Sequence, residues 1–236
     1  MKTLPLDSSP VNIVQIETGA SRTAGLLTSQ TTPARPPAVA EKLQKMEIQR
    51  FWAIGNLGIL ENPLLAFFCS SKCPENVILG VHDLARILRD AGIPIISGFH
   101  SPMEKECLDL LLRGDQPVVI CPGRGIDGMR LPVEWRKGIS GNRLLLVSPF
   151  HSRLRRPTQA LTEIRNRFVA MIADSILVAH ADPGSKTERL CLELLETGKS
   201  LYSLGMTENN GLIEKGAVGI GGKELPDFFS QCSKKS

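Results

Sequence analysis

Leu64-Leu-Ala-Phe-Phe-Cys69 is followed by Ser70-Ser-Lys-Cys-Pro74 and then by a repeat of apolar residues from Val77 to Leu88. The first run has no polar alternation, which is typical of a strand covered on both faces. In the repeat, apolar residues stand three and four positions apart, which predicts a helix that ends at Gly92. This order of strand, polar loop and helix decides the fold class, because the rest of the chain repeats it.

Five further short apolar runs follow along the chain. They are Ile93–Ser97, Pro117–Cys121, Leu144–Ser148, Ser175–Ala179 and Ser200–Leu204. Helical spacing recurs between them at Met103–Arg113, Gln159–Ala173 and Lys186–Glu196. Strand–helix alternation of this kind predicts right-handed crossovers and an α/β fold: a Rossmann-like, doubly wound, mostly parallel sheet.

The first 45 residues differ from the rest. Pro33, Pro36 and Pro37 interrupt any long periodicity, and Gly, Ser and Thr are abundant. One strand is expected at Val11–Ile16 and a short helix at Ala38–Lys45. We therefore predict an irregular N-terminal arm over 1–45, extended or partly disordered, a Rossmann-like domain over 46–222 and a C-terminal tail over 223–236.

The overall composition is that of an ordinary globular protein, with 42% hydrophobic and 22% charged residues. It argues against wholesale disorder, collagen and coiled-coil rods. No apolar run approaches the roughly 18–20 residues that span a bilayer, and the N-terminus has no apolar signal region. The six cysteines are scattered, which favours free thiols, no metal site and a cytoplasmic protein without membrane association.

The formal net charge of +4 is concentrated in one place. Between Arg143 and Arg167 the chain has six arginines and a single acid, Glu163, whereas the rest has 22 basic and 23 acidic residues. The arginines are 143, 153, 155, 156, 165 and 167. Because they are expected after one strand and at the start of the next helix, we place them at the ligand edge of the sheet.

In a doubly wound sheet, ligands bind beyond the carboxyl ends of the strands. Four polar loops are expected there: Ser70–Pro74, Ser97–Pro102, Cys121–Asp127 and Ala181–Thr187. Free N–H groups at helix N-termini, hydroxyls and a Lys or Arg together make an anion site, although Ser, Thr and Gly also serve simply as caps and turns. Several such loops beside six arginines favour a ligand that carries phosphate.

Other motifs are incomplete. No GxGxxG follows the first strand, and Gly184-Ser-Lys-Thr187 lacks the upstream glycine of a Walker A loop. His100 and His180 are expected at strand ends, where they could line a cleft, but no catalytic triad or metal-binding spacing emerges. Asp174 is expected to be a turn or capping residue. The aromatics available near the loops for base stacking are Phe99, Phe150 and Phe168.

Seven segments form an ordered set of motifs. They are Phe51–Leu60 with its Gly55-Asn-Leu57, expected before the first strand, Ser70-Ser-Lys72, Ser97-Gly98, Gly125-Ile-Asp127, Arg165-Asn-Arg167, Gly184-Ser-Lys-Thr187 and Gly211–Ala217. Together, over about residues 51–218, they resemble the DNA-processing protein A (DprA/Smf) family, and more widely the SLOG/LOG-like Rossmann superfamily. The chain is a divergent member by this comparison, since Ser70 replaces a glycine and Pro102-Met-Glu104 stands where members have Gly-Ile-Asp.

The resemblance implies binding of single-stranded DNA in DNA uptake and recombination, a RecA recombinase partner and a homodimer. It implies no cofactor and no catalytic residue, so we expect a binding protein rather than an enzyme. Ser70, Ser71 and Lys72 would hold one phosphate, and Gly184, Ser185, Lys186 and Thr187 another. Arg165 and Arg167 would bridge them, with Asn166, Ser97 and Gly98 nearby.

Two alternatives remain open. LOG-type phosphoribohydrolases cut nucleoside monophosphates, and Arg165 has the spacing to Asp174 of their arginine. Their catalytic glutamate would fall three residues after Thr187, where this chain has Leu190. A carboxylate is needed there to stabilise the ribosyl centre. The second alternative is a nucleotide sensor without turnover.

Overall fold

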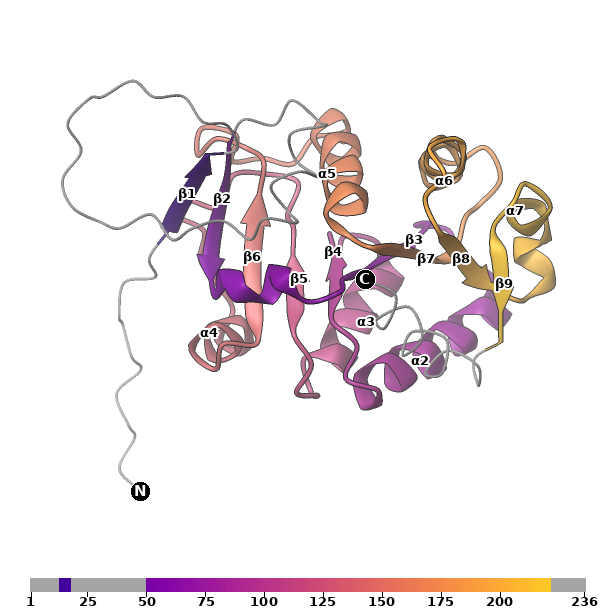
Figure 1. Ribbon diagram of the computed structural model, residues 1–236, viewed down its shortest axis with the longest axis horizontal. Helices are drawn as coiled ribbons and strands as arrows, with labels where there is room; N and C mark the ends of the chain where they lie inside the picture. Colours follow the sequence, from indigo (N-terminus) through magenta and orange to yellow (C-terminus); the bar gives the residue numbers. More distant parts are fainter. Residues whose placement is uncertain (1–12, 18–49, 222–236) are drawn as a thin grey trace.

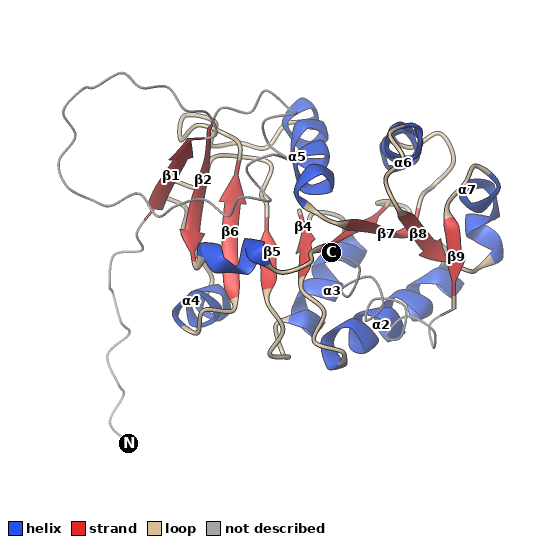
Figure 2. Cartoon of the chain, viewed as in Figure 1, coloured by secondary structure: helices blue, strands red, loops and turns tan. Residues whose placement is uncertain are grey.

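The computed structural model describes residues 13–17 and 50–221, so the helix expected at Ala38–Lys45, the C-terminal tail and both predicted domain boundaries lie outside it. In the described part, nine strands form one sheet in the order β1-β2-β6-β5-β4-β3-β7-β8-β9 (Figures 1 and 2). They are β1 (Ile13–Glu17), β2 (Arg50–Gly55), β3 (Leu65–Cys69), β4 (Ile95–Ser97), β5 (Val118–Ile120), β6 (Leu144–Ser148), β7 (Ser175–His180), β8 (Leu201–Leu204) and β9 (Val218–Ile220). β2 is antiparallel to both of its neighbours, β1 and β6, and all other neighbouring strands are parallel.

Helices cover both faces of the sheet (Figure 2). They are α2 (Glu75–Asp90), α3 (Pro102–Leu111), α4 (Val133–Ser140), α5 (Gln159–Ile172), α6 (Lys186–Glu196) and α7 (Asn210–Glu214), with 3-10 turns η1 (Leu57–Glu61) and η2 (Thr207–Asn209). One core packs against α2, α3 and α4, and the other packs against η1, α5, α6 and α7. The fold is the predicted Rossmann-like α/β class.

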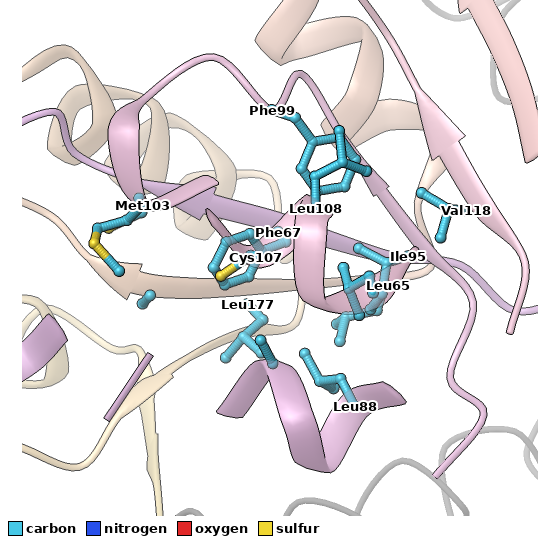
Figure 3. Close-up of a cluster of buried hydrophobic side chains, with 14 of the residues drawn as sticks. Leu65, Phe67, Leu88, Ile95, Phe99, Met103, Cys107, Leu108, Val118 and Leu177 are labelled. Atoms are coloured by element: carbon cyan, nitrogen blue, oxygen red, sulfur yellow. The ribbon is translucent and has the colours of Figure 1, made fainter. Parts of the chain in front are cut away.

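The central strand β3 shows why this sequence forms a two-sided sheet. All five of its residues are buried, and Leu65 and Phe67 face the α2 and α3 core whereas Phe68 faces the opposite core. On α2, the apolar residues three and four positions apart are the buried ones, and Leu88 packs in the same cluster as Leu65 (Figure 3). Alternate residues of the strand and every third or fourth residue of the helix therefore pack together in one apolar layer.

The six strands and four helices expected from the sequence are confirmed, with bounds that shift by one or two residues at most ends. The strand expected at Val11–Ile16 is present as β1. The first half of the segment expected before the first strand, Phe51–Leu60, belongs to a strand, β2, which extends the sheet beside β6. Gly55 ends β2 with φ of +117°, and a Cβ there would lie 2.6 Å from the Leu144 carbonyl oxygen.

The order of strands reverses between β3 and β7. From β3 the chain moves outward through β4 and β5 to β6, and α5 then carries it back to β7 on the other side of β3. The helices that follow β3 and β7, α2 and α6, consequently lie on opposite faces of the sheet. Such a switch point leaves a crevice outside the carboxyl ends of the strands, where ligands bind in this fold class.

Candidate functional site

A pocket of about 160 Å³ lies at the carboxyl edge beside this switch point. The end of β3, the first turn of α3, and helices α5 and α6 line it. The lining residues are Phe68, Cys69, Ser71, His100, Ser101, Glu104, Thr162, Glu163, Arg165, Asn166, Arg167, Lys186, Thr187, Arg189, Leu190 and Glu193. Six of the residues predicted for the phosphate site are among them: Ser71, Arg165, Asn166, Arg167, Lys186 and Thr187.

Arg165 is the buried cation of the pocket, with only 3% of its surface exposed. Its Nη1 donates to the Cys121 carbonyl oxygen at 3.1 Å, at the end of β5. Its guanidinium lies directly over Gly98, where a Cβ would be 1.0 Å from Nη1. In the described part of the chain no carboxylate pairs with Arg165, and its Nε has no hydrogen-bond partner. A buried charge without a counter-charge favours an anion as neighbour.

The loop after β4 is a tight turn that follows Ser97. The Ser97 Oγ accepts a hydrogen bond from the Phe99 N–H at 3.3 Å, and Phe99 has a φ of +47°. Left-handed backbone is unusual for a bulky residue and is found where the surroundings enforce it. Ser97 is fully buried, so it shapes the turn rather than facing a ligand.

Glu104 fixes that turn to the end of β3. Its Oε1 accepts from the Cys69 N–H at 3.1 Å, and its Oε2 accepts from the N–H groups of His100 at 2.7 Å and Ser101 at 3.3 Å. Ser101 in turn caps α3 by accepting from the Glu104 N–H. The spacing of this capping box is visible in the sequence, but the bond to Cys69 joins α3 to the end of β3, which is distant in sequence.

The two loops at the switch point are tied together by hydroxyls. The Ser70 Oγ accepts from the Asp182 N–H at 3.0 Å and lies 3.2 Å from the Ser185 Oγ. Ser185 also caps α6 by accepting from the Glu188 N–H. Ser70 and Ser185 therefore bind each other's loops, whereas the exposed Lys72 and the pocket-lining Ser71 are turned to the surface.

The loop at Gly184 is occupied by a carboxylate of the same chain. The Glu188 Oε2 accepts from the Gly184 N–H at 2.7 Å, and its Oε1 accepts from Lys215 at 2.6 Å. These bonds, that from Lys215 above all, lower the pKa of Glu188. A phosphate at the Gly184 N–H would have to displace Glu188. In addition, Glu188 is not among the residues that line the pocket, and Leu190, at the position expected for a hydrolase glutamate, is buried.

Two of the predicted phosphate contacts form ion pairs within the chain. Arg167 makes a bidentate pair with Glu193, with both N–O distances 2.9 Å, and Lys186 pairs with Glu163 at 2.9 Å. These hydrogen bonds lower the pKa of Glu193 and of Glu163. Arg167 and Lys186 are thus neutralised at the pocket, whereas Arg165 is a buried cation that has no carboxylate partner among the described residues.

The loop from 149 to 158, after β6, differs from the pocket in the pairing of its cations. It exposes Arg153, Arg155 and Arg156, and none of these forms an ion pair with residues 13–17 or 50–221. The loop is held against the one after β5, because the Gly125 N–H donates to the Leu154 carbonyl at 2.9 Å and Arg124 donates to that of Arg155 at 3.2 Å. Three unpaired guanidinium groups are therefore presented from an anchored backbone.

Two expectations about this edge are wrong. Arg143 precedes β6 at the opposite edge, where its guanidinium donates to the carbonyl oxygens of Leu112 and Gly114 beyond α3. Phe99, Phe150 and Phe168 are at most 5% exposed, so they are core residues and cannot stack on a base. The sequence placed them near the loops but did not show which way they point.

The histidines and Asp174 divide into different roles. His100 lines the pocket as expected, whereas His180 is 3% exposed and its Nδ1 lies 2.9 Å from the Asn209 amide oxygen. Asp174 accepts from the Leu64 N–H at 2.8 Å, which fixes the start of β3 to the start of β7. The residues that sequence reasoning missed are Glu104, Thr162, Arg189 and Glu193, and their role at the pocket depends on contacts between helices that are distant in sequence.

Comparison with known proteins places this geometry in a family. A model of the DNA recombination-mediator protein A family matches residues 31–217. The chain belongs to this family. The match begins within the segment expected to be an arm. A search of curated proteins finds no match. No helix in the described ranges is long and apolar enough to cross a membrane.

Two solved structures of this family share the fold. DNA processing protein A from Streptococcus pneumoniae has 21% identity and a TM-score of 0.62, over 75% of this chain and 65% of that one. This chain therefore spans less than two thirds of the Streptococcus protein. DNA processing protein A from Helicobacter pylori, whose structure concerns a single-stranded DNA binding mode, has 18% identity and a TM-score of 0.66, over 92% of this chain and 99% of that one.

Proposed function

We propose that this protein binds single-stranded DNA at the carboxyl edge of its sheet, chiefly through phosphate contacts from Arg153, Arg155 and Arg156. Membership of the DNA recombination-mediator protein A family supports a DNA-processing role. The observation that carries the proposal is the contrast in charge pairing: the three loop arginines have no acidic partner among the described residues, whereas Arg167 and Lys186 do. DNA uptake or recombination as its setting, a RecA partner and a homodimer stay predictions from the family resemblance.

The loop arginines favour phosphate binding for an electrostatic reason. Unpaired guanidinium groups neutralise phosphates and release condensed counterions, so binding weakens steeply as salt rises. An arginine that already holds a carboxylate must first give up that partner. We therefore place the main strand-binding surface on the loop from 149 to 158, with Lys72 and Arg167 contributing less.

Replacing Arg153, Arg155 and Arg156 together by alanine is expected to weaken binding of an oligo-dT strand and to flatten its salt dependence. Loss of three contacts should reduce the slope of log K against log salt by about 2 for single strands. Fluorescence anisotropy across a salt series measures both quantities. The control is Arg86→Ala/Arg113→Ala/Lys137→Ala, which removes the same charge from exposed positions on or beside α2, α3 and α4. An equal loss in the control would contradict the proposal.

Arg165 favours a second candidate, a non-catalytic site for a small nucleotide. Its Nε has no partner among the described residues, and side chains of α3, α5 and α6 line a small pocket around it, which suits one phosphate group better than a running strand. We expect saturable binding of dTMP by calorimetry, and about 10-fold weaker binding in Arg165→Lys, because lysine lacks the planar fork. Arg86→Lys is the control at an exposed, paired arginine outside the pocket. No free base should be released, and its release would favour the hydrolase alternative instead.

A further inference from the structure

Trp52 and His151 form an aromatic pair beside the arginine loop. Trp52 is on β2 and stands opposite Ser148, the last residue of β6, in the antiparallel ladder. The chain turns out of β6 there, and three residues later the His151 ring lies against the indole, with ring centroids 5.7 Å apart and planes at 84°. Figure 1 shows β2 next to β6, at the end of the sheet far from β9. The pair therefore lies where the loop from 149 to 158 begins.

The surroundings hold both rings in place. The His151 Nδ1 accepts from the Arg153 N–H at 3.2 Å and lies 3.3 Å from the Ser152 Oγ. The His151 backbone is packed against Gly125, where a Cβ would be 2.5 Å from the His151 carbonyl oxygen. Trp52 is half-buried and packs against the core on the α2, α3 and α4 face. His151 itself is exposed, so its ring is ordered and still accessible.

We propose that Trp52 and His151 form a platform on which an unpaired base of the bound strand stacks, while the loop arginines hold the adjoining phosphates. This inference rests on the proposed function, since it assigns bases to the surface that binds the phosphates. Single-strand-binding surfaces combine a cationic track with aromatic side chains in this way. The phenylalanines of this edge are buried and cannot supply the stacking. A duplex keeps its bases stacked on each other, so the platform favours single strands.

The test compares oligo-dT with an abasic oligonucleotide of the same length, which has the same phosphates and no bases. The platform predicts that the wild-type protein binds oligo-dT at least about 5-fold more tightly than the abasic strand. His151→Asn, which removes the ring and keeps a side-chain acceptor for the Arg153 N–H, should remove that preference while leaving the affinity for the abasic strand unchanged. Ser152→Ala is the matched control, because it removes the hydroxyl next to His151 and keeps the ring.

Tryptophan fluorescence gives an independent measurement. The chain has two tryptophans, so Trp135→Phe leaves Trp52 as the single reporter. Oligo-dT should quench it and the abasic strand should not, and Trp52→Phe, which leaves Trp135, should show no quenching. If both strands bind equally and Trp52 is not quenched, the platform is wrong and the phosphate model stands. If neither strand binds, the proposed function fails and the platform fails with it. Equal affinity for duplex and single strand would also overturn the platform.

Discussion

Glu104→Ala is expected to be among the most destabilising single substitutions at the pocket. The carboxylate accepts hydrogen bonds from the N–H groups of Cys69, His100 and Ser101, and Cys69 and Ser101 are buried, as Glu104 itself is. Each buried donor left without a partner is unfavourable, so we expect a loss of about 3 kcal/mol or more in the free energy of unfolding. Thermal unfolding followed by circular dichroism should show a midpoint lower by about 6–12 °C.

Two other substitutions on the same helix separate this effect from a general loss of charge. Glu104→Gln keeps one acceptor oxygen and should retain part of the stability. Glu106→Ala removes an exposed carboxylate that contacts His82, and it should change the midpoint little. If Glu104→Ala lowered the thermal midpoint no more than Glu106→Ala does, the three hydrogen bonds of Glu104 to backbone N–H groups would not be what holds α3 against β3.

Gly98→Ala is expected to displace Arg165 from its place over the end of β4. The new Cβ would lie 1.0 Å from Nη1 and 1.9 Å from Cζ of Arg165, which no rotation of the methyl group relieves. Overpacking of this kind lowers the free energy of unfolding by about 2 kcal/mol. The same change should weaken dTMP binding, because the guanidinium no longer reaches the Cys121 carbonyl. Calorimetry of unfolding and of binding measures the two effects.

A double-mutant cycle identifies the cause of the Gly98 effect. In an Arg165→Ala background, Gly98→Ala should be much less destabilising, because the methyl group then enters the space that the guanidinium has left. Gly211→Ala, a helical position with nothing within 4 Å of the added Cβ, is the glycine control. Strictly additive effects of the two substitutions would show that Gly98 and Arg165 do not share this space.

The parallel part of the fold was predictable because its signals are local. Buried runs such as Leu65–Cys69 and the helical spacing of α2 depend on residues that are close in sequence. β2 was missed as a strand because its pairing partners, β1 and β6, are distant in sequence. A six-residue segment that ends at Gly55 does not by itself reveal such pairing.

The site was predicted as a set of loops but not as a set of contacts. The spacing of Arg165 and Arg167 places both on α5, yet it does not show that one is buried over Gly98 while the other pairs with Glu193. The capping role of Ser185 follows from its position before a helix, whereas the bonds of Glu188 to the Gly184 N–H and to Lys215, which follows α7, could not be predicted. Long-range side-chain partners decide which cations stay available.

The bonds made by Ser70 and Glu104 have a consequence for the rate of ligand capture. They order the loops after β3, β4 and β7 when the chain folds, so the ligand does not have to order those loops itself. A preorganised surface loses less conformational entropy on association. Encounter with a strand at this edge should accordingly proceed in a single kinetic phase whose rate is proportional to strand concentration, without a slow rearrangement that saturates at high concentration.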